Sequence, residues 1–204
     1  IYTITLHDAL PISNVDVDQV LSYVEQHPEE IALPESYTDV YDVSYFRSVP
    51  VYCFIGLPSL VKQAIQDKVL TSPRDRFIFI TSPRKGEVTI NNSRILGVDS
   101  TNAANLSQAE LAGRRQVMEL MEFFHGYVPG FQEAQLIDTA DELGLRESRR
   151  FKGLYKLSKQ DVVSGASFPD GIGKGGYSID IHDKDGASIT LIGISSPYDI
   201  PYGC

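Results

Sequence analysis

A long segment in the middle of the chain has apolar residues at helical spacing. Its apolar side chains recur every three or four positions, at Leu111, Val117, Leu120, Met121 and Phe124. This spacing predicts an amphipathic helix with one face against a core. Ser107 and Glu110 match a capping box, which predicts the start of the helix, and Gly126 and Pro129 predict its end. We expect this helix to be the central packing element.

Shorter helices and strands are predicted on both sides of it. Apolar stripes predict helices over residues 16–27 and after Pro58, and Ser158 is placed to cap a short helix that ends at Gly165. Strand-like runs cover residues 51–55, 77–81, 87–91, 134–139, 144–151, 177–182 and 188–194. Turn residues at 82–86 and 183–187 join two pairs of these runs as hairpins, whereas residues 29–49 read as a loop. This order predicts an α+β fold with a mixed, largely antiparallel sheet and one long packing helix.

The charge balance argues against two classes of partner. Lys and Arg number 18 and Asp and Glu 27, which gives the 204-residue chain a net charge of −9. Non-specific binding to nucleic acid or to anionic membranes needs a basic surface. No apolar run approaches the roughly 18 residues of a membrane span. We therefore expect a soluble protein, cytoplasmic or periplasmic, with no nucleic-acid or membrane partner and an undetermined oligomeric state.

Both ends of the sequence have unusual features. Residues 1–13, IYTITLHDALPIS, look like a translated sequencing adapter, and the alternative is a native strand followed by a proline turn. We expect a non-native leader there and leave it out of the fold prediction. The last residues, from Ile200 to Cys204, close no helix or strand. Residues 14–204 are therefore predicted to be an internal piece of a longer protein.

A glycine-rich run fits a dinucleotide-binding pattern in its letters only. Gly171 to Gly176 reads G-x-G-x-x-G, but a true fingerprint follows a strand and opens a helix. Here the run follows Pro169 and Asp170 and precedes a predicted strand. We predict a flexible turn. The histidines and the two cysteines lack metal-ligand spacing, so no metal site is predicted.

Two further segments carry candidate chemistry. Arg146, Arg149 and Arg150 place three guanidinium groups within five residues. Such a cluster of positive charges needs anionic partners, which are either structural carboxylates or a bound substrate carboxylate or cofactor phosphate. In residues 177–182, Tyr177 and the isoleucines alternate with Ser178, Asp180 and His182, so the face with Tyr177 and the isoleucines is predicted to meet a core. Neighbours two apart on a strand lie about 6.6–7 Å apart, too far for a catalytic triad. The polar face is then either solvated or part of a cleft with a titratable histidine.

Several of these segments, together with others upstream, occur in the same order as in a known protein family. Residues 146–150, 157–165, 168–170, 177–182 and 197–202, with upstream stretches at 73–76, 86–91, 98–101 and 113–116, resemble the bacterial FAD-dependent oxidoreductases from about Val15 to Tyr202. The resemblance implies FAD as cofactor and hydride transfer between flavin and a small polar or anionic substrate. It also implies that residues 14–204 form a single substrate-side, cap-like domain. The Rossmann segment that binds FAD is then missing from this piece, which we expect to be inactive alone.

Within this family, flavin chemistry assigns expected roles to the candidates. His182 is the expected base or substrate donor, and Arg146 is expected to stabilise an anionic substrate or the flavin edge. Arg149, Arg150, Tyr177 and Asp180 are expected to bind the substrate, and the residues that hold the flavin are not predicted. The alternatives are a non-catalytic binding module, for carbohydrate for example, or a structural domain. In the binding module, Tyr37, Tyr41 and Tyr45 would be the stacking surfaces.

Overall fold

The chain forms two compact units. The computed structural model describes residues 3–5, 10–33, 41–145, 149, 152–182 and 189–204. The first unit comprises residues 1–148 and the second residues 149–204. None of the helices among the described residues is long and apolar enough to cross a membrane.

The first unit is built on a five-stranded antiparallel sheet with the order β3-β4-β5-β2-β7. Its strands are β3 (Cys53–Gly56), β4 (Phe77–Thr81), β5 (Val88–Ile90), β2 (Leu10–Ser13) and β7 (Gln135–Leu136). A three-stranded sheet is formed by β6 (Ile95–Leu96), β1 (Thr3–Thr5) and β8 (Gly144–Leu145). Together with the helices, these sheets confirm the predicted α+β class with largely antiparallel pairing.

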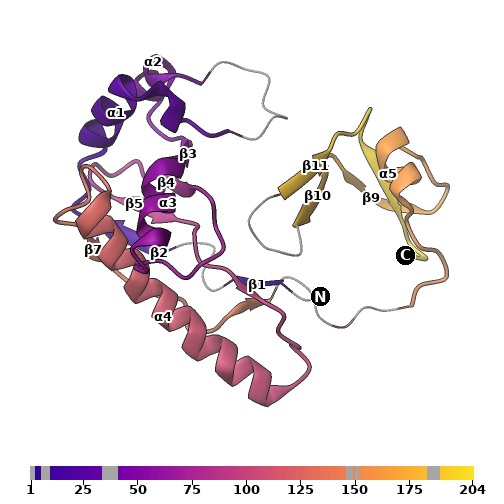
Figure 1. Ribbon diagram of the computed structural model, residues 1–204. Helices are drawn as coiled ribbons and strands as arrows, with labels where there is room; N and C mark the ends of the chain where they lie inside the picture. Colours follow the sequence, from indigo (N-terminus) through magenta and orange to yellow (C-terminus); the bar gives the residue numbers. More distant parts are fainter. Residues whose placement is uncertain (1–2, 6–9, 34–40, 146–148, 150–151, 183–188) are drawn as a thin grey trace. The chain divides into compact units, whose positions relative to one another are not determined.

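The helices of the first unit begin where local side chains can cap them. They are α1 (Val17–Gln26), the 3₁₀ helix η1 (Pro28–Glu30), α2 (Val43–Ser48), α3 (Pro58–Gln66) and α4 (Ala103–Tyr127). Asp16 caps α1, and Pro58 opens α3 as predicted. The prediction of a loop over residues 29–49 was wrong for α2, which lies beside α1 (Figure 1). Asp42 accepts the backbone N–H of Tyr45 at 2.8 Å and starts this short helix.

The long helix α4 begins earlier than predicted. Asn102 is its N-cap, with Oδ1 accepting the backbone N–H groups of Ala104 at 2.9 Å and Asn105 at 3.2 Å. Ser107 lies inside the helix and donates its hydroxyl to the carbonyl of Ala103. The predicted capping box at Ser107 was therefore wrong, because Asn102 satisfies the first amides one turn earlier.

Aromatic rings join α4 to strand β4 on the face that the spacing of Val117, Leu120 and Phe124 predicted, whereas Leu111 of the same predicted stripe is 57% exposed. Phe77 of β4 lies with its ring centroid 5.9 Å from Phe123, 5.4 Å from Phe124 and 5.6 Å from Phe131. All four rings are fully buried. Because buried aromatic rings contribute large apolar areas, this cluster stabilises the packing of α4 and Phe131 against β4.

Strand β2 comes from the segment that the sequence suggested setting aside. It lies between β5 and β7, with Leu10 paired to Ile90 and Ile12 paired to both Val88 and Leu136. Leu10 and Ile12 are 1% and 0% exposed. The fold therefore includes a strand from residues 1–13, while the origin of these residues stays a prediction.

The second unit contains two antiparallel pairs and one helix. Strands β9 (Gly171–Gly175) and β12 (Tyr198–Pro201) pair, as do β10 (Ile179–His182) and β11 (Ile189–Ile192). Helix α5 (Lys159–Ser164) has the predicted cap at Ser158 and ends at Gly165 in the left-handed conformation. The predicted turn over the glycine run was wrong. It is strand β9, and its Gly175 lies directly against the ring of Tyr198, where a side chain would not fit.

The predicted core face of β10 is not buried. Ile181 is 46% exposed and Tyr177 is 70% exposed. Among the described residues of the second unit, only Asp199 and Pro201 are buried. A two-stranded hairpin has no second layer of its own, so alternation alone does not bury its apolar face.

Candidate functional site

The arginine segment can be placed only in part. Arg149 is exposed at the start of the second unit. Arg146 and Arg150 lie outside the described residues, so the predicted arrangement of the three guanidinium groups stays a prediction.

The other predicted site residues lie on or next to a single hairpin. Asp180 and His182 occupy alternate positions of β10, paired through the backbone with Leu191 and Ile189. Tyr177 lies two residues before this strand, with its ring exposed. The antiparallel pairing of β10 with β11 confirms the predicted hairpin, whose turn at residues 183–188 lies outside the described part. The structure thus places Asp180 and His182 on β10 and Tyr177 just before it, with Arg149 on a separate segment.

A buried carboxylate that the sequence analysis did not select organises the second unit. Asp199 of β12 is 8% exposed. Its Oδ1 accepts the Lys174 ammonium at 2.6 Å. Its Oδ2 accepts the Ser167 hydroxyl at 2.6 Å and the Phe168 backbone N–H at 3.1 Å. One carboxylate therefore ties β12 to β9 and to the loop after α5.

These contacts also decide what Asp199 can do chemically. The hydrogen bonds from Lys174, Ser167 and the Phe168 amide lower the pKa of Asp199 to about 2. A carboxylate with this pKa is ionised at neutral pH and takes up protons poorly, so it suits an anchor better than a general base. The signal in the sequence was a lone charged residue between Tyr198 and Ile200 in a strand. The matching cation, Lys174, stands 25 positions earlier and could not be paired with it by spacing.

A second carboxylate holds the start of α5. Asp161 Oδ2 accepts the hydroxyl of Tyr155 at 2.8 Å and both the backbone N–H and the hydroxyl of Ser158 at 2.7 Å. These bonds lower the pKa of Asp161, led by the backbone bond from Ser158. The ring of Tyr155 in turn packs edge-on against Phe168, with centroids 5.1 Å apart. Asp161 and Asp199 thus fix the loop residues on either side of α5.

Two of the tyrosines considered for carbohydrate stacking pack against other rings. Tyr41 and Tyr45 meet edge to face at 4.7 Å, and Tyr45 also meets Phe46 at 5.5 Å. Tyr37 lies outside the described residues. Sugars stack on open ring faces, so this packing gives the binding-module alternative no specific support.

Comparison with known proteins identifies the family. A family model described as FAD dependent oxidoreductase matches residues 15–204. The chain belongs to this family of FAD-dependent oxidoreductases. No curated protein and no solved structure gives a significant match to the chain. FAD is the cofactor that the family implies, and its members act as oxidoreductases on small molecules.

The described residues of this FAD-dependent oxidoreductase chain do not fit the phosphates of the cofactor. The glycine run is strand β9 paired with β12, and the next element is strand β10, so the run does not open a helix as a phosphate-binding turn does. The turn from β3 into α3 comes nearer to the required strand–turn–helix order. Its helix N-terminus is taken by buried Glu30, whose Oε2 accepts the backbone N–H of Ser59 at 3.3 Å and whose Oε1 accepts the Ser59 hydroxyl. A protein carboxylate thus fills the place that a phosphate would need.

Proposed function

We propose that residues 14–204 form the substrate-side domain of a larger FAD-dependent oxidoreductase. In this proposal the Rossmann segment that binds FAD lies outside the chain. The observation that carries the proposal is that the glycine run forms a strand and not a phosphate-binding turn. It fits the dinucleotide pattern in its letters but forms strand β9 inside a chain that matches the family over residues 15–204. The chain matches the family, and its described residues offer no turn that would bind the FAD phosphates. We therefore assign it the substrate side of the enzyme.

The proposed substrate is a small polar or anionic molecule whose oxidation is coupled to the flavin. Arg146, Arg149 and Arg150 hold its anionic group, because guanidinium groups bind carboxylates and phosphates in a bidentate manner. Tyr177 and Asp180 hydrogen-bond its polar groups, supported by their exposure beside one hairpin. His182 gives or takes the proton at the reacting carbon, since its ordinary pKa lies near neutrality.

The first test is flavin retention. The purified chain, mixed with FAD and then desalted, is expected to emerge colourless because the described residues offer no site for the pyrophosphate. The absorbance near 450 nm relative to that at 280 nm measures the bound fraction. A desalted yellow protein with about one flavin per chain would show that the cradle lies within these 204 residues.

The role of His182 is tested in the enzyme that carries this chain together with its flavin-binding segment. His182→Ala is expected to slow anaerobic flavin reduction by ~10²–10⁴-fold, as loss of a general acid or base does. A panel of hydroxy acids and amines is first screened with the unaltered enzyme. Those compounds that reduce its flavin, seen as loss of flavin absorbance, serve as substrates in the assay. His27→Ala is the matched control, because His27 lies in the first unit at the end of α1. Equal reduction rates in the two variants would rule out the proton-transfer role.

A further inference from the structure

One face of α4 is left uncovered by the described residues. The helix packs Val117, Leu120 and Phe124 against the core. On the opposite side, Leu111 is 57% exposed and Met118 is 68% exposed. These two apolar residues stand seven positions apart, which is close to two helical turns, so they lie on one stripe of the helix. The solvent face of a surface helix ordinarily carries polar residues, so the apolar stripe sets this face apart.

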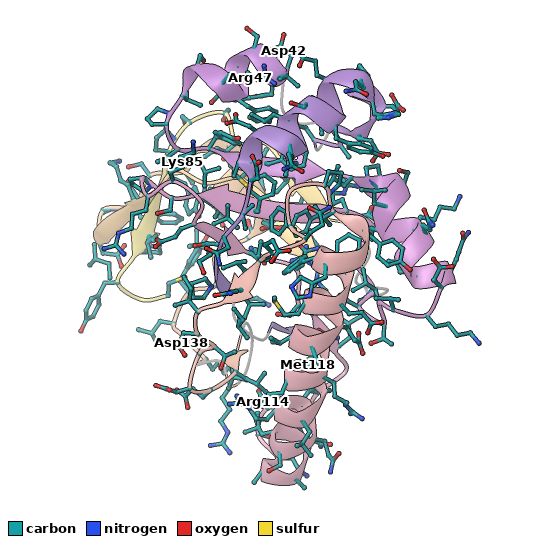
Figure 2. The ribbon with its side chains drawn as sticks, turned by 90° about the vertical axis from the view of Figure 1, so that its left-hand side faces the viewer. Asp42, Arg47, Lys85, Arg114, Met118 and Asp138 are labelled. Carbon is teal, nitrogen blue, oxygen red and sulfur yellow. The ribbon has the colours of Figure 1, made fainter. Side chains whose placement is uncertain are left out.

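A shallow groove follows the exposed face. It has a volume of about 1040 Å³, runs along residues 111–126 and is open along its length. Its apolar lining consists of Leu111, Met118 and Met121. Because an α-helix rises about 1.5 Å per residue, the groove is about 22 Å long. Figure 2 shows Arg114 and Met118 along α4, in the lower part of the view. A long, open groove is suited to a second helix, whereas a small molecule needs an enclosing pocket.

Two of the charged groups beside the groove are already paired inside the chain. Arg114 Nη2 lies 2.8 Å from Glu110 Oε1, one turn earlier in the helix. Glu119 accepts the backbone N–H of Thr71 at 2.9 Å and its hydroxyl at 2.8 Å. These side chains are held by the fold of the first unit and are not available to an incoming surface.

Arg115 and Glu122 differ from them. Both are exposed and line the groove, and neither has an ion pair or a side-chain hydrogen bond within the described part of the chain. They stand seven positions apart, so they share the stripe of Leu111 and Met118. The face therefore carries an unpaired positive charge before Met118 and an unpaired negative charge after it.

This order of residues is complementary to itself when a second copy of α4 runs antiparallel. The two-fold axis passes between residues 118 and 119, and Arg115 and Glu122 each stand three and a half positions from it. Arg115 of each copy then faces Glu122 of the other, and the two Met118 side chains meet near the axis. Leu111 meets Gly126, where a side chain would find nothing within 4 Å. In a two-fold interface every such contact occurs twice.

The same charges select the antiparallel direction. A parallel copy in register brings Arg115 against Arg115 and Glu122 against Glu122, and like charges that face each other are unfavourable. Because this chain supplies both halves of the charge pattern and the apolar centre between them, its best complement is a second copy of itself.

We propose that α4 forms a two-fold symmetric, antiparallel homodimer through its exposed face. A single pair of helices buries less surface than the roughly 1,200–2,000 Å² of a stable interface, so the dimer is weak and concentration-dependent. The interface is built from the first unit alone and does not depend on the substrate role proposed for the second unit.

The test is sedimentation equilibrium of the whole chain from micromolar to submillimolar concentration. The average mass is expected to rise with concentration from that of the 22.6 kDa monomer towards that of a dimer. Arg115→Glu and Glu122→Arg should each weaken association on the order of tenfold or more, because each places like charges opposite one another at two positions. Lys62→Glu, at an exposed lysine of α3, is the matched charge reversal and should associate like the unaltered chain.

Mixing the two variants separates a direct contact from a general effect of charge. An equal mixture of the Arg115→Glu and Glu122→Arg chains brings opposite charges together again, so association is expected to return to near that of the unaltered chain. Circular dichroism of each variant should match the unaltered chain, because both residues are exposed. The proposal is overturned by a monomer mass at every concentration, by a dimer that both reversals leave intact, or by a mixture that associates no better than its separate components.

Discussion

Deletion of residues 1–13 is expected to unfold the first unit, whereas deletion of residues 1–9 is expected to leave its five-stranded sheet in place. The longer deletion removes β2, which separates β5 from β7 and pairs with both. It also removes the buried side chains of Leu10 and Ile12, whose burial contributes about 1.5–3 kcal/mol each. The total is a large part of the 5–15 kcal/mol that keeps a typical domain folded. Thermal denaturation followed by circular dichroism measures the effect.

The shorter deletion is the matched control for this experiment. It removes β1, a strand of three residues, and retains β2. Single substitutions refine the comparison, because Leu10→Ala and Ile12→Ala should each cost about 2–5 kcal/mol. A chain without residues 1–13 that melts like the full chain would contradict the prediction, and it would favour the interpretation of these residues as a non-native leader.

Asp199→Asn is expected to release β12 from β9 and from the loop that follows α5. The substitution removes the charge that accepts bonds from Lys174, Ser167 and the Phe168 amide. Few other described side chains in the second unit are buried, so little else replaces this anchor. Hydrogen exchange of the β9 and β12 amides should accelerate on the order of tenfold or more. Asp170→Asn, an exposed aspartate of the same unit, serves as the control.

The same carboxylate predicts an acid dependence with a definite direction. The pKa of Asp199 is lowered from 3.8 to about 2 in the folded chain. Its stabilising contribution is therefore complete above about pH 4 and is lost as the pH falls towards about 2. Exchange in β9 and β12, measured from pH 5 to pH 2, should lose protection in this window in the unaltered chain. The Asp199→Asn variant should lack this step, and an equal acid response in both proteins would exclude Asp199 as its source.

The elements predicted correctly are those whose information is local. The stripe before His27 predicted α1, Pro58 predicted the start of α3, and Ser158 predicted the cap of α5. The hairpins of β4 with β5 and of β10 with β11 were also predicted, because turn residues lie between two apolar runs. In each case the residues that decide the structure are close together in the chain.

Two of the wrong predictions concern choices between local signals of similar strength. Ser107 and Asn102 both suit a helix N-cap, and the structure uses Asn102 because α4 extends one turn further. The glycine run is permissive in conformation, so its pairing with β12 across more than twenty residues decides that it is a strand. Such a pairing cannot be read from the composition of either segment.

Sequence patterns alone predicted the α+β class, the long helix of the first unit and the family resemblance, which the family match confirmed. Periodicity and motif order are properties of the residue order, so they can be recognised from the sequence without a structure. The pairing of β2 within the main sheet and the contact of Lys174 with Asp199 became known from the folded structure. It alone also left the Tyr52 hydroxyl buried without a hydrogen-bond partner among the described residues. These features depend on which distant segments meet, and burial and hydrogen bonding arise only when they do.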